Sequence, residues 1–340
     1  MNKITSVSYA GNPKDYTAMF ITNKVSHLLN NLYGHVGCLL FVETGMQIPD
    51  DLLALHEFSF SDNPQREYAE FANQIAKERE ERNRTRKYTL TDGGYYIGEN
   101  VSIGEDSIIE PNVLIGHDVV IGKHARIAFG TVIHSATIGD FFTACENCVV
   151  GTNGFTMADD EQGNKIRIPT LGKVIIGNHV ELGAVSIISV GSGGDTIIED
   201  NVKIDTHVHI GHDDVIGKNT ELTAGVILGG YNTIGEKSFF GLNSTTKNRI
   251  RLGDSCYLGM GTNALKDVPA NTTVVGNPAR PLVKEQKNVQ PACQNGNKGG
   301  NITKYGGVTA TIFRMNSIKN SRDFSREFFY CFRSKYTRWS

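Results

Sequence analysis

Apolar residues recur at every sixth position through the middle of the chain. The pattern runs over residues 97–133, continues after a one-residue slip over 138–150, and returns over 176–188 and 198–264. A glycine directly follows many of these positions, as Gly98 does, which suits a repeated tight turn. A period of six fits neither the α-helix nor a simple hairpin. Hexapeptide repeats of this kind predict a mainly β protein built on a parallel β-helix.

In a parallel β-helix, each repeat contributes a short strand whose apolar side chain enters the core, and we expect the glycine to turn the corner. Two stretches interrupt the period. A long insertion covers residues 152–173, and a short insertion, "VGSGGD", covers residues 190–195. Loops inserted into a solenoid gather on one face and often carry the function. We therefore expect the functional site to lie near these two insertions.

The ends of the chain follow other patterns. The apolar run "HVGCLLFVE" (35–43) predicts a strand, and "NPQREYAEFANQIAKEREERN" (63–83) predicts a helix. We expect a small α/β domain and linker over residues 1–90 and the β-helix over 91–284. Residues 285–340 are predicted to be a flexible linker and a basic C-terminal segment that is able to form a helix.

Charge and cysteine content narrow the range of partners. The 34 Lys and Arg residues nearly balance 36 Asp and Glu residues, so nothing in the net charge favours nucleic acid. The apolar run "CLLFV" (38–42) is far too short to span a bilayer, and we expect a cytoplasmic protein without a transmembrane segment. The pair Cys145 and Cys148 has no second pair at zinc spacing, so we expect no metal site.

Four stretches resemble one family, the UDP-3-O-acylglucosamine N-acyltransferases, which are hexapeptide-repeat enzymes. They are "FITN" (20–23), "DNPQREYAEFA" (62–72), "GTNGF" to "LGA" (151–184) and "GDTIIEDNVKIDTHVHIGHDDVIG" (194–217). The resemblance implies a left-handed coil of eighteen residues and a homotrimer with sites between subunits. It also implies transfer of an acyl group from an acyl carrier protein thioester to the amine of a UDP-linked (3-O-acyl)glucosamine, as in lipid A biosynthesis.

His212, in "HVHIGHDDVIG", is the candidate catalytic base. It follows the inward Ile210 by two positions, so its side chain is expected to point away from the core, and an imidazole suits removal of a proton from an amine. Gly230 lies eighteen residues further on, at the same corner one coil along, where its N–H suits an oxyanion. The resemblance implies the same two roles. Asp213 and Asp214 are interpreted as solvated turn acids, with orientation of the imidazole as the alternative.

The resemblance also implies substrate contacts. Asn153, Gly154 and Phe155 would touch the substrate or the acyl chain, and Phe20 and Asn23 would stack on and hydrogen-bond a uracil. Apart from the resemblance, His209 is expected to point outward and line the cleft, and His207 is a candidate to meet ligand phosphates. Arg249 stands where the family has a second histidine. These candidate substrate-binding residues are Phe20, Asn23, Asn153, Gly154, Phe155, His207, His209 and Arg249.

Other functions stay open at this stage. The ending "VVGNPARPL" (274–282) is equally similar to sugar acetyltransferases, so acetyl-CoA is an alternative donor, for N- or O-acetylation of a nucleotide sugar in surface polysaccharide synthesis. A zinc carbonic anhydrase would use His207 and His212, which have H-x₄-H spacing. A non-catalytic sugar-nucleotide-binding trimer would fit Ser189 and Thr206, where the family has other residues. The basic C-terminal segment is a candidate dock for acyl carrier protein.

Overall fold

Three parallel strands and three helices form the N-terminal domain of the structure, a computed structural model that describes residues 4–282. The strands pair in the order β1-β2-β3. The elements are β1 (Ala18–Ile21), η1 (Asn23–Leu32), β2 (Leu39–Glu43), α1 (Asp50–Leu55), β3 (Glu57–Ser61) and α2 (Pro64–Asn83). The predicted segment 285–340 lies outside the described residues.

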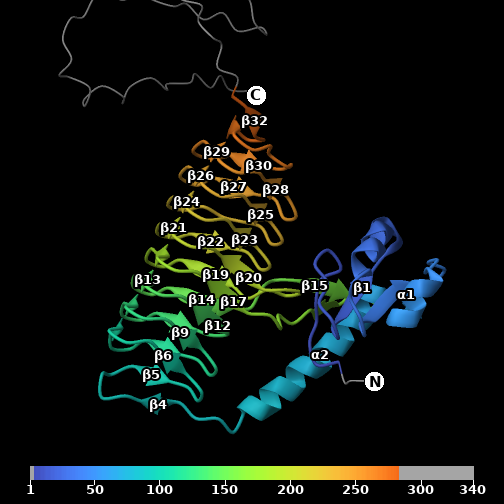
Figure 1. Cartoon of the computed structure of the whole chain (residues 1–340), viewed down its shortest axis with the longest axis horizontal. Coiled ribbons are helices and arrows are strands. Elements are labelled where there is room, and N and C mark those ends of the chain that lie inside the picture. The colour runs from blue at the N-terminus through green and yellow to red at the C-terminus, as the bar shows by residue number, and fades with distance from the viewer. Residues whose placement is uncertain (1–3, 283–340) are drawn as a thin grey trace, which may run out of the picture. The chain divides into compact units, whose positions relative to one another are not determined.

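Helix α2 begins where the sequence provides a cap. The Asn63 side chain accepts a hydrogen bond from the Arg66 N–H at 3.1 Å, and Pro64 occupies the first turn, where its missing N–H costs nothing. The buried side of α2 includes Tyr68, Ala69 and Ala72, which pack against the sheet. This helix therefore joins the N-terminal sheet to the repeats that follow it (Figure 1).

The repeats form stacked coils whose short strands build three sheets, parallel except where the terminal strands β4 (Thr89–Leu90) and β32 (Arg280–Pro281) pair antiparallel with their neighbours (Figure 1). One sheet contains β4 (Thr89–Leu90), β5 (Tyr96–Ile97), β8 (Leu114–Ile115), β11 (Val132–Ile133), β14 (Val149–Thr152), β19 (Ile187–Ser189) and β22 (His209–Ile210). Isolated bridges through Ile227 continue it to β27 (Thr245–Thr246) and β30 (Asn263–Ala264).

The second and third sheets complete each coil. The second contains β6 (Ser102–Ile103), β9 (Val120–Ile121), β12 (Ala136–Ile138), β17 (Val174–Ile176), β20 (Thr196–Ile198), β23 (Val215–Ile216), β25 (Thr233–Ile234) and β28 (Arg251–Leu252). The third contains β7 (Ile108–Ile109), β10 (Arg126–Ile127), β13 (Thr143–Ala144), β18 (Glu181–Leu182), β21 (Lys203–Ile204), β24 (Glu221–Leu222), β26 (Phe239–Phe240), β29 (Tyr257–Leu258), β31 (Thr273–Val275) and β32 (Arg280–Pro281).

The six-residue period marks the residues that form the core of the β-helix, as the sequence predicts. The second residue of most of these strands is fully buried, as Ile115, Ile133 and Ile210 show, and these residues form one continuous core. Strands one coil apart pair in register, so Ile108 stands beside Arg126. The predicted parallel β-helix is confirmed.

The glycine that follows each apolar residue does not turn the corner, and that expectation was wrong. The residue with positive φ comes two positions later, as Asn100 (φ 57°) does after Gly98. A Cβ on Gly98 would lie only 2.6 Å from the His117 backbone nitrogen of the next coil. These glycines are required because successive coils approach one another closely there.

The two insertions leave the regular coil on one side. The long insertion contains an antiparallel hairpin, β15 (Met157–Asp159) and β16 (Lys165–Arg167), which contacts α2. The Gln65 side chain on α2 donates to the Met157 carbonyl at 3.2 Å. A Cβ on Gly193 in the short insertion would meet Tyr9 of the N-terminal segment at 3.0 Å. Both insertions therefore bring the N-terminal domain against the β-helix. Among residues 4–282, no helix is both long and apolar enough to cross a bilayer.

Asp214 is buried in the β-helix with incomplete hydrogen bonding, which gives a pH-dependent prediction. Its Oδ1 accepts from the Asn232 N–H at 2.8 Å, whereas Oδ2 has no partner, and burial raises the pKa of this carboxyl well above its ordinary value of 3.8. Below pH 3.8 both the folded and the unfolded chain carry the proton. As the pH rises, the unfolded chain loses it first, so this residue lowers stability at neutral pH.

Asp214→Asn is therefore expected to raise the free energy of unfolding at pH 7 by something on the order of 1 kcal/mol, with no gain near pH 3.5. Urea unfolding at the two pH values measures the difference. Asp106→Asn, at an exposed position of positive φ, is the matched control and should change neither value. An equal effect of Asp214→Asn at both pH values would contradict the assigned protonation.

Candidate active site

His212 lies outside the core, at a corner of the β-helix, as its position after Ile210 predicts. Its side chain is 16% exposed, because the long insertion and the following coil cover it. Its Nδ1 lies 2.8 Å from Asp213 Oδ2, and its Nε2 lies 3.2 Å from the Thr156 hydroxyl. A carboxylate at Nδ1 holds the ring proton there, which leaves Nε2 as the proton acceptor. The imidazole is thus oriented for general base chemistry.

Asp213 is not a solvated turn acid, so that interpretation was wrong. Its side chain is 6% exposed and accepts hydrogen bonds from the Ser192 N–H at 2.7 Å, the Ser192 hydroxyl at 2.8 Å and the Gly193 N–H at 3.0 Å. Burial raises the pKa of Asp213, but the hydrogen bonds from His212 and Ser192 outweigh burial and hold the pKa below its ordinary value. Asp213 is therefore an ionised partner for His212.

Two aromatic rings and an arginine continue this cluster along the next coils. The Tyr231 ring stands edge-on to His212 at 5.0 Å, and its hydroxyl lies 2.9 Å from Ser192 Oγ. The Arg249 guanidinium lies 4.1 Å from the Tyr231 ring centre and 5.1 Å from that of Tyr9. Asp213, Tyr231 and Arg249 follow one another at intervals of eighteen residues and share positive φ. They form one column of side chains beside the column of His212 and Gly230.

Gly230 borders the Nε2 side of His212. A Cβ on Gly230 would lie 2.8 Å from both Cε1 and Nε2 of the imidazole, so only glycine fits at this distance. At the equivalent position of the first coil, the Glu99 N–H donates to His117 Nδ1 at 2.9 Å. Within the described residues, the Gly230 N–H has no such acceptor. A free N–H beside Nε2 is suited to bind an oxyanion.

The remaining candidates on the long insertion differ in position. Gly154 packs on His212, because a Cβ there would lie 2.9 Å from the ring Cδ2. Phe155 is 78% exposed, with the Arg167 guanidinium 5.3 Å from its ring centre. The Asn153 side chain accepts from the Thr170 hydroxyl at 2.7 Å on the surface. Gly154 belongs to the cluster, and Phe155 extends away from it.

The histidines near His212 occupy two different environments. His209 lies on β22 and is partly buried, and burial together with the nearby His212 lowers its pKa. His207 is exposed at a corner with φ 57°. Among residues 4–282, no group of three or more His, Cys, Asp or Glu side chains is arranged to hold a metal ion. Burial raises the pKa of the Cys148 thiol, in the C-x-x-C pair, to about 11.

Phe20 and Asn23 lie in the N-terminal domain and not at the corner that carries His212. The Phe20 ring is partly buried and packs on Tyr68 at 5.2 Å between ring centres. The Asn23 N–H donates to Glu43 Oε2 at 2.6 Å, and its side chain is exposed. Their expected role in binding a uracil stays a prediction.

The sequence did not identify four residues of the cluster, namely Tyr9, Thr156, Ser192 and Tyr231. Tyr231 had a usable signal, since it follows Asp213 by eighteen residues exactly as Gly230 follows His212. Beside the cluster lies a cavity of about 530 Å³, lined in part by Tyr9, Asp213, Tyr231 and Arg249. The cluster therefore has an adjoining space for a ligand.

Parts of the chain are similar to known hexapeptide-repeat proteins and to acyltransferases. Residues 91–190 match the family model described as GMPPB C-terminal domain, and residues 231–262 match the hexapeptide repeat of succinyl-transferase. A UDP-3-O-acylglucosamine N-acyltransferase of Helicobacter hepaticus is 37% identical over 187 residues, which are 55% of this chain and 57% of that protein. One from a Caulobacter species is 34% identical over 44% of each chain. The chain thus spans about half the length of the curated relatives it matches.

Solved structures agree in fold. A UDP-N-acetylglucosamine acyltransferase from Campylobacter jejuni superposes with a TM-score of 0.50 at 25% identity, covering 56% of this chain and 72% of that one. A UDP-N-acetylglucosamine O-acyltransferase from Moraxella catarrhalis gives a TM-score of 0.51 at 24% identity, covering 58% and 76%. The chain is therefore a left-handed β-helix protein of hexapeptide repeats that is similar, over about half its length, to the UDP-3-O-acylglucosamine N-acyltransferases.

Proposed function

We propose that this protein is an N-acyltransferase of lipid A biosynthesis. It moves an acyl group from an acyl carrier protein thioester to the amine of a UDP-linked (3-O-acyl)glucosamine. The observation that carries the proposal is the arrangement of His212, whose Nδ1 lies 2.8 Å from Asp213 Oδ2, while Gly230 lies so close to Nε2 that a Cβ on it would be 2.8 Å away. The relatives of 34% and 37% identity carry the name of this activity.

The proposed reaction uses this arrangement in two steps. The sugar amine takes the place of the Thr156 hydroxyl at Nε2, and His212 accepts a proton as the amine nitrogen bonds to the thioester carbon. The carbonyl oxygen gains negative charge and accepts the hydrogen bond from the Gly230 N–H. The C–S bond then breaks, and His212 returns its proton to the departing thiolate. Asp213 stays ionised and stabilises the imidazolium between the steps.

Substrate contacts and assembly form the less direct part of the proposal. Gly154, Phe155 and Asn153 would contact the acyl chain, because they border the Nε2 side of His212 or extend from it. The sugar nucleotide would contact Arg249, His209 and His207. Its uracil would contact Phe20 and Asn23. A homotrimer in the cytoplasm, with each site between two subunits, belongs to the same proposal. The 78% exposure of Phe155 supports it, since an exposed phenylalanine is suited to a subunit interface.

A second candidate is an acetyl-CoA-dependent acetyltransferase of nucleotide sugars. The ending "VVGNPARPL" (274–282), which is similar to that of sugar acetyltransferases, favours it, and the His212 cluster suits any thioester donor. Both candidates predict the same chemistry at Nε2 and differ in the donor and acceptor.

Initial rates distinguish the two candidates. The assay follows release of the thiol. We expect the purified protein to turn over a hydroxyacyl-acyl carrier protein with a UDP-linked amino sugar at least about 100-fold faster than it turns over acetyl-CoA with a UDP- or dTDP-amino sugar. The control lacks the amino sugar and reports simple hydrolysis. Faster turnover with acetyl-CoA would replace the first candidate by the second, and turnover with neither donor would refute both.

A further inference from the structure

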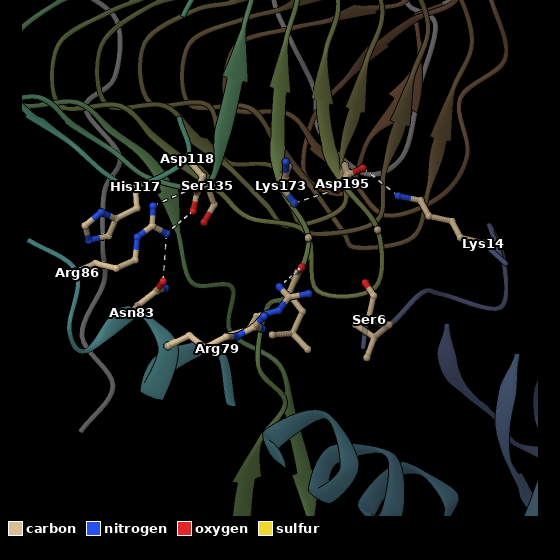
Figure 2. Close-up of a pocket in the computed structure, with 15 residues that line it drawn as sticks. Ser6, Lys14, Arg79, Asn83, Arg86, His117, Asp118, Ser135, Lys173 and Asp195 are labelled. Carbon is tan, nitrogen blue, oxygen red and sulfur yellow. Dashed lines mark hydrogen bonds and ion pairs between the residues drawn. The ribbon is translucent and has the colours of Figure 1, made fainter. Parts of the chain in front are cut away.

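A cavity rich in basic side chains lies away from His212, between α2, the N-terminal segment and the β-helix (Figure 2). Its volume is about 590 Å³. The cationic side chains on its wall are Lys14, Arg79, Arg82, Arg86 and Lys173, and the carboxylates are Asp118 and Asp195. It shares only Lys14, Gly194 and Asp195 with the cavity beside Tyr231. The basic cavity thus adjoins that space, but no residue of the His212 cluster lines it and its wall has an excess of positive charge.

The two carboxylates are already occupied. Asp195 pairs with the Lys14 ammonium at 2.9 Å, and Asp118 pairs with the Arg86 guanidinium, as the dashed lines in Figure 2 show. Within the part of the chain that the structure describes, no carboxylate forms an ion pair with Arg79, Arg82 or Lys173. Three cations on the cavity wall therefore have no counter-charge among the described residues.

Arg79 is held in place by neutral groups. Its guanidinium donates to the Leu171 carbonyl at 2.7 Å and to the Thr5 carbonyl at 3.3 Å, which orient it without neutralising it. Lys173 uses its backbone N–H, and not its ammonium, to bind Asp195 at 2.9 Å. An arginine fixed by carbonyls beside a lysine free to turn is an arrangement suited to bind phosphate oxygens.

The C-terminal end of α2 explains only part of this charge. The carbonyls of a helix end act as about half a negative charge, which favours a cation such as Arg82 in the last turn. Burial, and then the nearby Arg82, lower the pKa of Arg79. A guanidinium that is buried beside a second cation is unfavourable, and a bound anion would offset that cost.

We propose that this cavity binds a phosphate-class anion with at least two phosphoryl groups, either free pyrophosphate or the diphosphate of a nucleotide. The unpaired cations come from two separate segments, α2 and the end of the long insertion. A single phosphate is too small to contact all of them at once. The volume exceeds that of one phosphate many times over, since a water molecule takes about 30 Å³. The proposal concerns a site other than the His212 cluster and does not depend on acyl transfer.

Calorimetric titration of the full-length chain at low salt tests the proposal, with pyrophosphate, UDP and uridine as the probes. Saturable binding is expected for pyrophosphate. Any binding of uridine would report the uracil contacts proposed at Phe20 and Asn23, and Lys173→Gln should leave it unchanged. Lys173→Gln and Arg79→Gln are each expected to weaken pyrophosphate at least tenfold. Lys237→Gln, which replaces an exposed lysine beside Glu236 on the surface, is the matched control and should bind as the wild type does. UDP binding that Lys173→Gln weakens as much as it weakens pyrophosphate binding would identify a nucleotide as a source of the diphosphate.

Two results would overturn the proposal: no saturable binding of pyrophosphate, or equal binding of pyrophosphate by wild type and Lys173→Gln. Lys173→Gln is the decisive variant, because its side chain makes no hydrogen bond within residues 4–282 and its loss leaves the fold intact. Arg79→Gln also removes two hydrogen bonds to carbonyls, so circular dichroism must first show that it is folded. Loss of pyrophosphate binding would leave acyl transfer at His212 unaffected and separately testable.

Discussion

Replacing His212 by alanine is expected to lower kcat for acyl transfer by about 10²–10⁴-fold, the usual contribution of a general base. Nε2 is the acceptor that would take the amine proton, and the change leaves no other side chain in that place. Asp213 keeps three hydrogen bonds from Ser192 and Gly193, so the carboxylate does not lose its support. We therefore expect KM and thermal stability to change little. Steady-state kinetics and a melting curve on the same sample measure both.

His124→Asn is the matched control for this prediction. His124 is an exposed histidine of the β-helix that, unlike His212, has positive φ (58°), and its ring stacks on Phe141. Asparagine accepts this backbone conformation. Its kcat should stay within twofold of the wild type. A His212→Ala protein that retains more than a tenth of wild-type kcat would rule out His212 as the base.

The second large effect is expected at Gly230. In Gly230→Ala the new methyl group would lie 2.8 Å from Cε1 and Nε2 of His212, which is closer than atoms in contact approach. The imidazole must shift, which changes the space between Nε2 and Gly230 in which we expect the oxyanion to bind. Removal of one oxyanion donor costs about 10²–10³ in kcat, and we expect a loss of that size here.

Gly93→Ala controls for the general cost of an added methyl group. Its Cβ would meet only the Tyr95 and Thr91 side chains, and its φ is not in the left-handed region. We expect near wild-type kcat for Gly93→Ala, with both variants folded by circular dichroism. If Gly230→Ala turns over as fast as Gly93→Ala, the oxyanion role assigned to Gly230 is wrong.

The repeats could be predicted because one physical rule governs them. Each strand of a coil must bury one apolar residue, so the core residues recur in the sequence at a fixed spacing, as Ile115, Ile133 and Ile210 show. The same arithmetic placed Gly230 beside His212. The same count of eighteen residues, started from Asp213 instead of His212, would have placed Tyr231 and Arg249 in one column with Asp213.

The other residues of the cluster reach it through contacts that do not follow the six-residue period. Thr156 and Ser192 come from the two insertions, and Tyr9 comes from the N-terminal segment, so their positions follow from how these loops pack on the coils. Asp213 appeared to be a turn acid because sequence does not show that the short insertion covers it. The glycines that follow the apolar positions were assigned to turns because the close approach of two backbones has no sequence signature of its own.

The most direct test is a single-turnover reaction with enzyme in excess over a hydroxyacyl-acyl carrier protein and with a UDP-linked amino sugar present, analysed by mass spectrometry. The account predicts that the wild type converts the thioester to an N-acylated sugar nucleotide, one amide per thiol released, and that His212→Ala does not within the same time. An intact or merely hydrolysed thioester with the wild type, or equal amide formation by His212→Ala, would contradict it.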